Sequence, residues 1–211
     1  MARSSVEHRF PEAARQSRYS RSTCLAIETG QLHRGLWTTN GAARSPMLLG
    51  RGSDKRVTLF EDGRGCVAHL RGDRRLLLRE ALVMLALGEH PHILGLHRLC
   101  VSCDDAFLQA PCAIHGSFLD LCDTLDFAGR GSEITDAHVA IAVGQIRVAL
   151  AHIQRRGFVH SDVRARNILV FSFTPSPARI HVRLGDLCDS SLGHMDVDTT
   201  CRALEKEMLR R

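Results

Sequence analysis

The sequence contains very little lysine, few aromatic side chains and no long apolar run. Only two of its 28 Lys and Arg residues are lysine, Lys55 and Lys206, and Tyr and Trp occur once each. No apolar stretch approaches the roughly 18 residues of a membrane-spanning helix, and the first residues lack the apolar region of a secretory signal. These absences argue against a membrane protein and against a secreted one.

The formal net charge of +5 comes almost entirely from arginine. The arginines are scattered and aromatic residues make up only 5% of the chain, whereas a nucleic-acid surface clusters basic groups with aromatics between them. We therefore expect no nucleic-acid partner; binding through an Arg-rich N-terminal segment is the lesser alternative. Because Arg scarcely deprotonates, the two lysines are chemically distinct, which makes the position of Lys55 informative.

Eight cysteines are spread along the chain without a secretory signal, so a disulfide framework is not expected. Cys100 and Cys103 have the spacing of a zinc pair, but no second pair accompanies them. Two cysteines at strand ends are the simpler interpretation. We expect an intracellular, cytoplasmic protein.

Residues 1–45 show no sustained periodicity and mix Arg, Ser, Thr, Gln and Gly. This composition predicts a disordered basic leader. The alternative, an organelle-transit peptide, is weakened by Glu7 and Glu12.

Residues 46–113 have the pattern of a strand-rich region. One helix is predicted at 74–87, where good helix formers run without Gly or Pro until Gly88. Asp62-Gly63 is typical of a hairpin turn. The predicted strands are 48–49, 57–60, 66–70, 96–101 and 107–110.

From residue 114 onward the pattern becomes mainly helical. Thr135 or Asp136 can cap a helix that ends at Gly157, and its apolar residues form a single stripe. The stripe consists of Val139, Val143, Ile146, Leu150 and Ile153. A hairpin is expected from 168–171 and 180–184. The final helical run, 203–210, has no obvious core to join.

Four stretches, in order, resemble the signature segments of a protein kinase, and the resemblance covers residues 47 to about 192. Asp162-x-x-x-x-Asn167 followed by an apolar strand and then Gly-Asp is the most specific part. The stretches are Leu49-Gly-Arg-Gly-Ser-Asp-Lys-Arg-Val57, Glu80–Met84 with His90–Leu94, His160–Asn167 and Leu184–Cys188.

The resemblance implies roles for the residues of the last two stretches. Asp162 would accept the proton of a substrate hydroxyl, and Asn167 and Asp186 would supply oxygen ligands to Mg²⁺. Arg164 resembles the arginine of tyrosine kinases, at a position where many serine/threonine kinases have Lys. It would hold the γ-phosphate or the substrate hydroxyl. A loop that merely caps its own backbone is the structural alternative for Asp162 and Asn167.

The resemblance also implies an ATP site. Gly50 and Gly52 would cradle the phosphates, and Ala110 would be the gatekeeper. The backbone groups of Pro111 and Ala113 would bond the adenine. The residues expected to enclose the ring are Val57, Ala68 and Leu169.

The largest departure within the ATP site concerns the strand lysine. Leu70 stands where the family has it, and Leu cannot pair with phosphate or with Glu80. Lys55 occupies the third-glycine position of the phosphate loop, and the with-no-lysine kinases resemble this arrangement. Lys55 is therefore the candidate phosphate-binding lysine, with an exposed loop lysine as the alternative. Glu80 would be its ion partner or a vestige.

Other departures bear on activity. Ser161 replaces the arginine before the catalytic Asp, and Cys188 replaces a glycine. Only 25 residues follow Asp186, without an Ala-Pro-Glu segment. We therefore expect the apolar stripe of the 135–157 helix to lose packing partners and become partly exposed.

Together these observations predict an α+β fold of two lobes, with a β-rich N-lobe at 46–113 and a partial, helical C-lobe at 114–211. The expected function is ATP-dependent phosphoryl transfer to a protein hydroxyl, on Tyr or on Ser/Thr. The alternative is a catalytically dead pseudokinase that binds nucleotide or acts as a scaffold.

Overall fold

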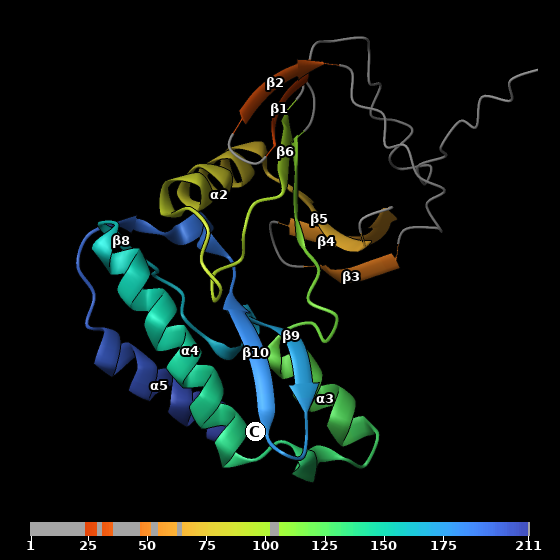
Figure 1. Cartoon of the computed structure of the whole chain (residues 1–211), viewed down its shortest axis with the longest axis vertical. Coiled ribbons are helices and arrows are strands. Elements are labelled where there is room, and N and C mark those ends of the chain that lie inside the picture. The colour runs from red at the N-terminus through yellow and green to blue at the C-terminus, as the bar shows by residue number, and fades with distance from the viewer. Residues whose placement is uncertain are drawn as a thin grey trace, which may run out of the picture. The chain divides into compact units, whose positions relative to one another are not determined.

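The computed structural model describes the backbone of residues 24–28, 31–35, 47–51, 55–62, 65–101 and 106–210, and the side chains of 57–58, 73–101 and 106–210. The chain divides into two compact units. The first contains Met1–Leu78 and Leu96–Cys112, and the second contains Arg79–Gly95 and Ala113–Arg211. Helices and strands occur in both parts of the chain (Figure 1), which confirms the predicted α+β class.

The first unit is built on one antiparallel sheet of seven strands in the order β2-β1-β6-β7-β5-β4-β3. All five strands predicted between residues 46 and 113 are present as β3 to β7. The pairing of β4 with β5 runs to Asp62 opposite Gly65, so the predicted hairpin is confirmed. The bounds are β1 (Cys24–Glu28), β2 (Gln31–Gly35), β3 (Met47–Arg51), β4 (Lys55–Asp62), β5 (Gly65–Gly72), β6 (Arg98–Val101) and β7 (Ala106–Pro111).

Strands β1 and β2 lie inside the segment that was predicted to be a disordered leader, 1–45. The prediction is wrong for these two strands; the other residues of that segment lie outside the described ones. β1 pairs with β6 from Leu25 opposite Val101 to Glu28 opposite Arg98. The pairing with β1 satisfies N–H and C=O groups of β6, and a short segment can provide such a pairing without strong periodicity of its own.

Helix α2 spans Arg74–Leu87, as predicted. Asp73 caps its start, because the Asp73 carboxylate accepts the N–H groups of Arg75 (2.8 Å) and Leu76 (3.1 Å). Gly88 follows its end at a φ of +73°, which other residues rarely adopt. The division between the two units falls within this helix, after Leu78.

The second unit contains the remaining helices and two small sheets. β9 pairs with β10 and β8 pairs with β11, both antiparallel. Helix α4 lies against β10 and α5, as Figure 1 shows. The bounds are α3 (Phe118–Phe127), η1 (Gly131–Glu133), α4 (Asp136–Arg155), β8 (Phe158–Val159), η2 (Ala165–Asn167), β9 (Ile168–Thr174), β10 (Arg179–Leu184), η3 (Leu187–Asp189), β11 (Ser191–Leu192) and α5 (Val197–Leu209).

The apolar stripe of α4 is buried along its whole length, so the expected exposure of this stripe is wrong. The expectation that the last helix has no core is also wrong. Helix α5 begins at Val197 and buries Cys201, Leu204 and Met208, and an ion pair between Arg147 and Asp198 joins it to α4. The spacing of three and four residues places these side chains on one helix face, which covers α4.

The pairing of β10 with β9 shifts in register between His181 and Val182. Ile180 and Val182 turn backbone groups to the other edge of β10, on which Leu184 bonds to residues 92 and 94. Gln145 of α4 pairs with two of these groups, since its Nε2 donates to the Ile180 carbonyl and its Oε1 accepts the Val182 N–H, each at 2.8 Å. The β9–β10 hairpin is thereby fixed on α4 by polar contacts as well as by apolar packing.

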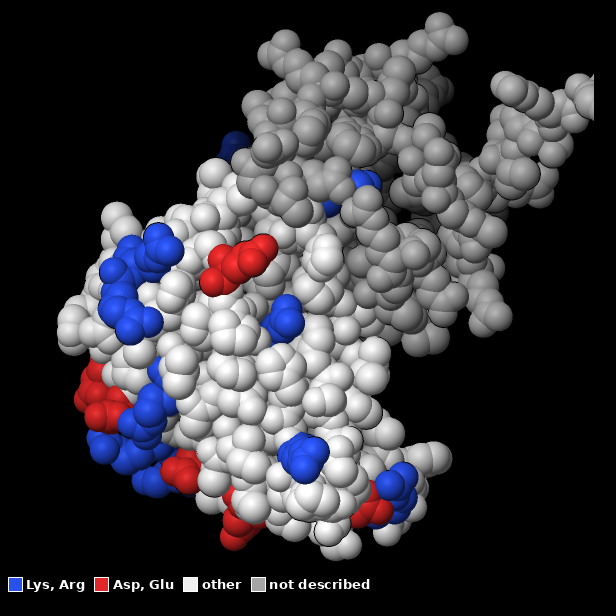
Figure 2. All heavy atoms as spheres, viewed as in Figure 1, with Lys and Arg blue, Asp and Glu red and all other residues white. Residues whose placement is uncertain are grey.

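The surface of the described part mixes charges of both signs. Figure 2 shows basic and acidic side chains next to one another along the edge where α4 and α5 lie. Within the described residues, no helix is both long enough and apolar enough to cross a bilayer.

We predict that Gln145→Leu lowers the free energy of unfolding by about 1–3 kcal/mol, because it leaves two buried backbone groups unpaired. Chemical denaturation followed by circular dichroism measures the change. Gln154→Leu is the matched control on the same helix. Among the described residues, the Gln154 side-chain amide contacts only His194, which is exposed. An equal loss in both variants would contradict the role of Gln145.

Candidate active site

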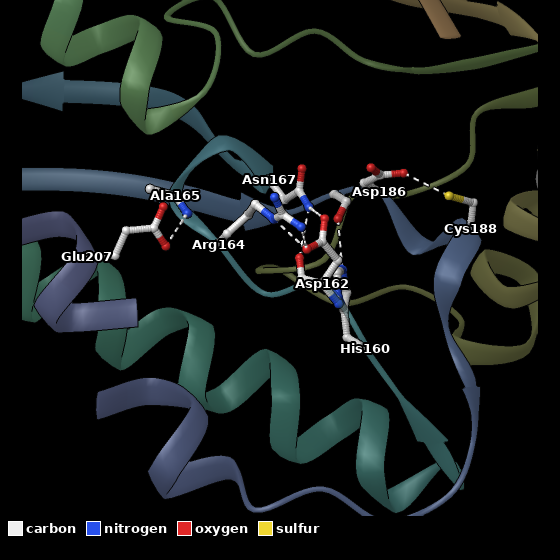
Figure 3. Close-up of polar contacts among 9 residues, drawn as sticks. His160, Asp162, Arg164, Ala165, Asn167, Asp186, Cys188 and Glu207 are labelled. Atoms are coloured by element: carbon white, nitrogen blue, oxygen red, sulfur yellow. Dashed lines mark hydrogen bonds and ion pairs between the residues drawn. The ribbon is translucent and has the colours of Figure 1, made fainter. Parts of the chain in front are cut away.

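The centre of the candidate site is a pair of hydrogen bonds made by one side-chain amide. Asn167 is only 7% exposed, and its Nδ2 donates to the Asp162 carbonyl (2.8 Å) and to Asp162 Oδ2 (2.9 Å). Figure 3 shows the two side chains facing each other at the start of β9. The spacing of five residues therefore closes a loop around Asp162, and the amide oxygen Oδ1 remains for a ligand.

Asp162 also forms an ion pair with Arg164 through its other oxygen, Oδ1. The side chain of Asp162 is 26% exposed and that of Arg164 is 42% exposed. Both carboxylate oxygens are thus engaged, one by a buried amide and one by a more exposed guanidinium. Because of its greater exposure, Arg164 is the partner that a substrate can displace more easily.

His160 connects this loop to the segment that carries Asp186. Its Nδ1 accepts the Asp162 N–H (3.2 Å), so its Nε2 carries the proton and donates to the Gly185 carbonyl (3.0 Å). Burial lowers the pKa of His160 and outweighs the opposing effects of the Gly185 hydrogen bond and of the nearby Asp186 and Asp162 charges. The ring is therefore neutral near pH 7 and holds two backbone segments together.

The β9–β10 hairpin brings Asp186 next to Asn167. Leu184 pairs with Ile168 in the ladder, and the Gly185 N–H donates to the Asn167 carbonyl at 2.9 Å. A Cβ at position 185 would lie 3.0 Å from Leu169 Cδ1, so the close approach favours glycine there. Asp186 has a φ of 58°, and its Oδ1 accepts the Cys188 thiol at 3.1 Å.

The donor chemistry of these residues fits Mg²⁺. An amide oxygen from Asn167 and carboxylate oxygens from Asp186 are hard ligands. Within the described part, no group of three or more His, Cys, Asp or Glu is arranged to hold a metal ion. Magnesium rarely uses a complete protein cage and usually completes its shell with water and substrate phosphate, so two protein ligands suffice.

Glu80 is fully buried on α2, where a carboxylate needs partners. It accepts the Leu187 N–H at 3.2 Å and so links α2 to the segment after Asp186. The predicted ion pair with Lys55 stays a prediction, because the Lys55 side chain lies outside the described ones.

The predicted nucleotide-binding residues fall in both units. Gly50 pairs with Val57 on neighbouring strands, and Ala68 pairs with Ala110, which is fully buried. Gly52 and the side chain of Ala68 are not described. The roles of these residues stay predictions.

The three remaining nucleotide positions are Pro111 in the first unit and Ala113 and Leu169 in the second. Pro111 ends β7, and the Ala113 carbonyl already accepts the Gly116 N–H at 3.0 Å. Leu169 forms a bridge with Ser117, the residue that caps α3. Their contacts with adenine likewise stay predictions.

Two contacts of this site were not found from the sequence. The Cys188 thiol donates to Asp186, and Glu207 of α5 accepts the Ala165 N–H at 3.3 Å (Figure 3). Cys188 was noted only as a departure from glycine. No local pattern indicates the Glu207 contact, because the two residues are 42 positions apart in the chain.

Comparison with known proteins agrees with this geometry. Residues 68–202 match the family model described as protein tyrosine and serine/threonine kinase. The human non-receptor tyrosine-protein kinase TNK1 is 31% identical over 143 residues, which is 68% of this chain and 19% of that protein. The chicken (Gallus gallus) Wee1-like protein kinase 2 is 30% identical over 98 residues, or 46% of this chain and 17% of that protein. The human tyrosine-protein kinase FRK is 29% identical over 93 residues, which is 44% of this chain and 17% of that protein. The matched region therefore spans less than a fifth of these relatives.

We predict that the His160 ring titrates below its usual pKa of 6.5 and carries its proton on Nε2 at neutral pH. Two-dimensional NMR of the ring nitrogens measures both properties. A histidine with a lowered pKa binds fewer protons when folded, so its contribution to stability is present above pH 6.5 and declines as the pH falls below it. His90 and His181 share this direction, so a global unfolding curve cannot separate the three. A pKa above 6.5, or a proton on Nδ1, would refute the assignment.

Proposed function

This chain belongs to the protein tyrosine and serine/threonine kinase family, and on that premise we propose that it transfers the γ-phosphoryl group of ATP to a protein hydroxyl. The observation that carries the proposal is the hydrogen-bonded pair of Asp162 and Asn167, located beside Asp186. An acid, an amide and a second acid in this arrangement suit phosphoryl transfer, which depends on alignment and charge neutralisation more than on covalent chemistry.

Asp162 is the residue that orients the acceptor. The hydroxyl donates to Asp162 Oδ1 in place of Arg164, while Asn167 keeps Oδ2 fixed. A bond forms between the hydroxyl oxygen and the γ-phosphorus, the bond from that phosphorus to the β–γ bridging oxygen breaks, and ADP leaves. The hydroxyl proton passes to Asp162, and the released Arg164 guanidinium pairs with the γ-phosphate.

The cofactors of this proposal are ATP and Mg²⁺. Asn167 and Asp186 hold the metal, which, when bound, neutralises phosphate charge. In the first unit, Gly50, Gly52 and Lys55 bind the phosphates. The residues assigned to adenine are Val57, Ala68, Ala110, Pro111, Ala113 and Leu169.

A second candidate is a pseudokinase that binds nucleotide or a protein partner without turnover. The ion pair of Arg164 with Asp162 favours it, because within the described part of the chain both carboxylate oxygens already accept a hydrogen bond. Leu70 in place of the strand lysine favours it too. The two candidates differ in whether a substrate displaces Arg164.

The remaining assignments follow from the family. We expect a protein substrate or protein partner, and we expect no nucleic-acid partner. An intracellular location is expected as well. The choice between Tyr and Ser/Thr leans toward Tyr because of Arg164.

We predict that Asp162→Asn lowers the rate of phosphate transfer to a generic acceptor, poly(Glu,Tyr), by about 10²- to 10⁴-fold, because the proton acceptor is lost. Radiolabelled ATP with Mg²⁺ measures the transfer. The affinity for ATP should change little, and the ATP-induced rise in Tm measures this.

Three outcomes of this experiment separate the candidates. Loss of transfer in the variant alone supports the kinase. If neither protein transfers phosphate but ATP still raises the Tm of both, the result supports the pseudokinase. If ATP affects neither protein, the kinase and the nucleotide-binding form of the pseudokinase are both contradicted.

We predict that Lys55→Met weakens ATP binding by about tenfold or more, because a charge-assisted contact with phosphate is lost. The ATP-dependent rise in Tm measures the affinity. Lys206→Met is the matched control, since Lys206 is the only other lysine and is exposed on α5. Unchanged affinity in Lys55→Met would remove Lys55 from the phosphate site.

A further inference from the structure

Helix α5 is held in one position on the second unit by contacts at its start and along its length. Asp196 caps it, because its carboxylate accepts the Thr199 N–H at 3.0 Å. Cys201, Leu204 and Met208 are almost fully buried, and α4 is the helix that α5 packs against. The helix therefore presents its remaining side chains at defined places.

Glu207 is next to this buried face and reaches the loop that carries Asp162. The residue is half-buried, and its Oε2 accepts the N–H of Ala165 at 3.3 Å, as Figure 3 shows. Ala165 is the first residue of η2 and is fully buried. The first N–H groups of a helical turn have no partner within the turn, and a buried amide without an acceptor is costly. Glu207 removes this cost.

The hydrogen bond from Ala165 to Glu207 matters because Ala165 lies between the two residues that contact Asp162. Ala165 follows Arg164, which pairs with Asp162, and precedes Asn167, which donates to Asp162. The Asn167 N–H in turn donates to the Arg164 carbonyl at 2.9 Å. A shift of the Ala165 backbone would therefore move both partners of Asp162.

We propose that Glu207 is a positioning residue of the site: through the Ala165 N–H it fixes the short turn that aligns Arg164 and Asn167 on Asp162. The effect of Glu207 on turnover rests on the proposed function. Its effect on the loop does not, so the two can be tested separately.

The test uses the full chain with Glu207→Leu, which removes the acceptor, and Glu207→Gln, which keeps a carbonyl acceptor of similar size. Glu205→Leu is the matched control, because Glu205 is on the same helix, is also half-buried and makes no side-chain hydrogen bond to η2 within the described residues. NMR measures hydrogen exchange at the Ala165 amide, with the amide of Ile146 in α4 as the reference for global unfolding.

In Glu207→Leu, we expect Ala165 to exchange at least about tenfold faster than in the wild type while Ile146 is unchanged. Glu207→Gln and Glu205→Leu should stay near the wild-type rate. If Glu207→Leu does not fold, Glu207→Ala, which places less apolar bulk on the loop, takes its place. An unchanged Ala165 rate, or an equal rise in Glu205→Leu, would overturn the proposal.

The second part of the test measures the kinetics of phosphate transfer in the same variants. If the chain transfers phosphate, Glu207→Leu should lower kcat by about tenfold with an unchanged KM for ATP, and Glu207→Gln should restore it. A rise in KM alone would contradict a positioning role. If the wild type is inactive, the proposed phosphoryl transfer fails, while the exchange data still decide the role of Glu207.

Discussion

The hydrogen bonds from the Asn167 amide to Asp162 are the contacts on which the candidate site depends. They close the loop from Asp162 to Asn167 at the start of β9, so the position of a carboxylate is fixed by a group that is itself nearly inaccessible to water. Because the amide nitrogen makes both of these hydrogen bonds, the amide oxygen is the atom that can bind a cation. In the proposed function, this one side chain both orients the base and contributes an oxygen to the magnesium ion.

The rest of the second unit keeps this loop in place from several sides. Neutral His160 joins it to Gly185, and the β9–β10 ladder sets Asp186 beside Asn167. That hairpin is in turn held on α4 by Gln145, which bonds to the edge of β10 that faces away from β9. The site is thus supported by polar contacts between segments that are distant in sequence, each of which satisfies a backbone group that would otherwise be buried without a partner.

The departures from the kinase pattern have specific structural consequences. Glu80 is buried and has a backbone partner at Leu187, so it is not left as an isolated charge even without a strand lysine at position 70. Cys188 donates to Asp186, a contact that glycine cannot make. Arg164 occupies an oxygen of Asp162. In an active enzyme, substrate displaces Arg164 from Asp162. In a binding module, the ion pair stays intact. The behaviour of this one ion pair therefore distinguishes the two functions.

The sequence by itself determined the elements whose signals are local. Helix α2 with Gly88 at its end, helix α4 with its apolar stripe, the β4–β5 hairpin and the Asp162–Asn167 spacing all follow from periodicity, capping and turn residues within one segment. The tertiary structure alone decided the pairing of β1 with β6, the packing of α5 on α4, and the contacts of Gln145 and Glu207. Each of these joins segments far apart in the chain, and the free energy that selects them comes from burying apolar side chains and pairing backbone groups. A local sequence pattern does not show which distant side chain or backbone group will become the partner, because the two meet only in the folded chain.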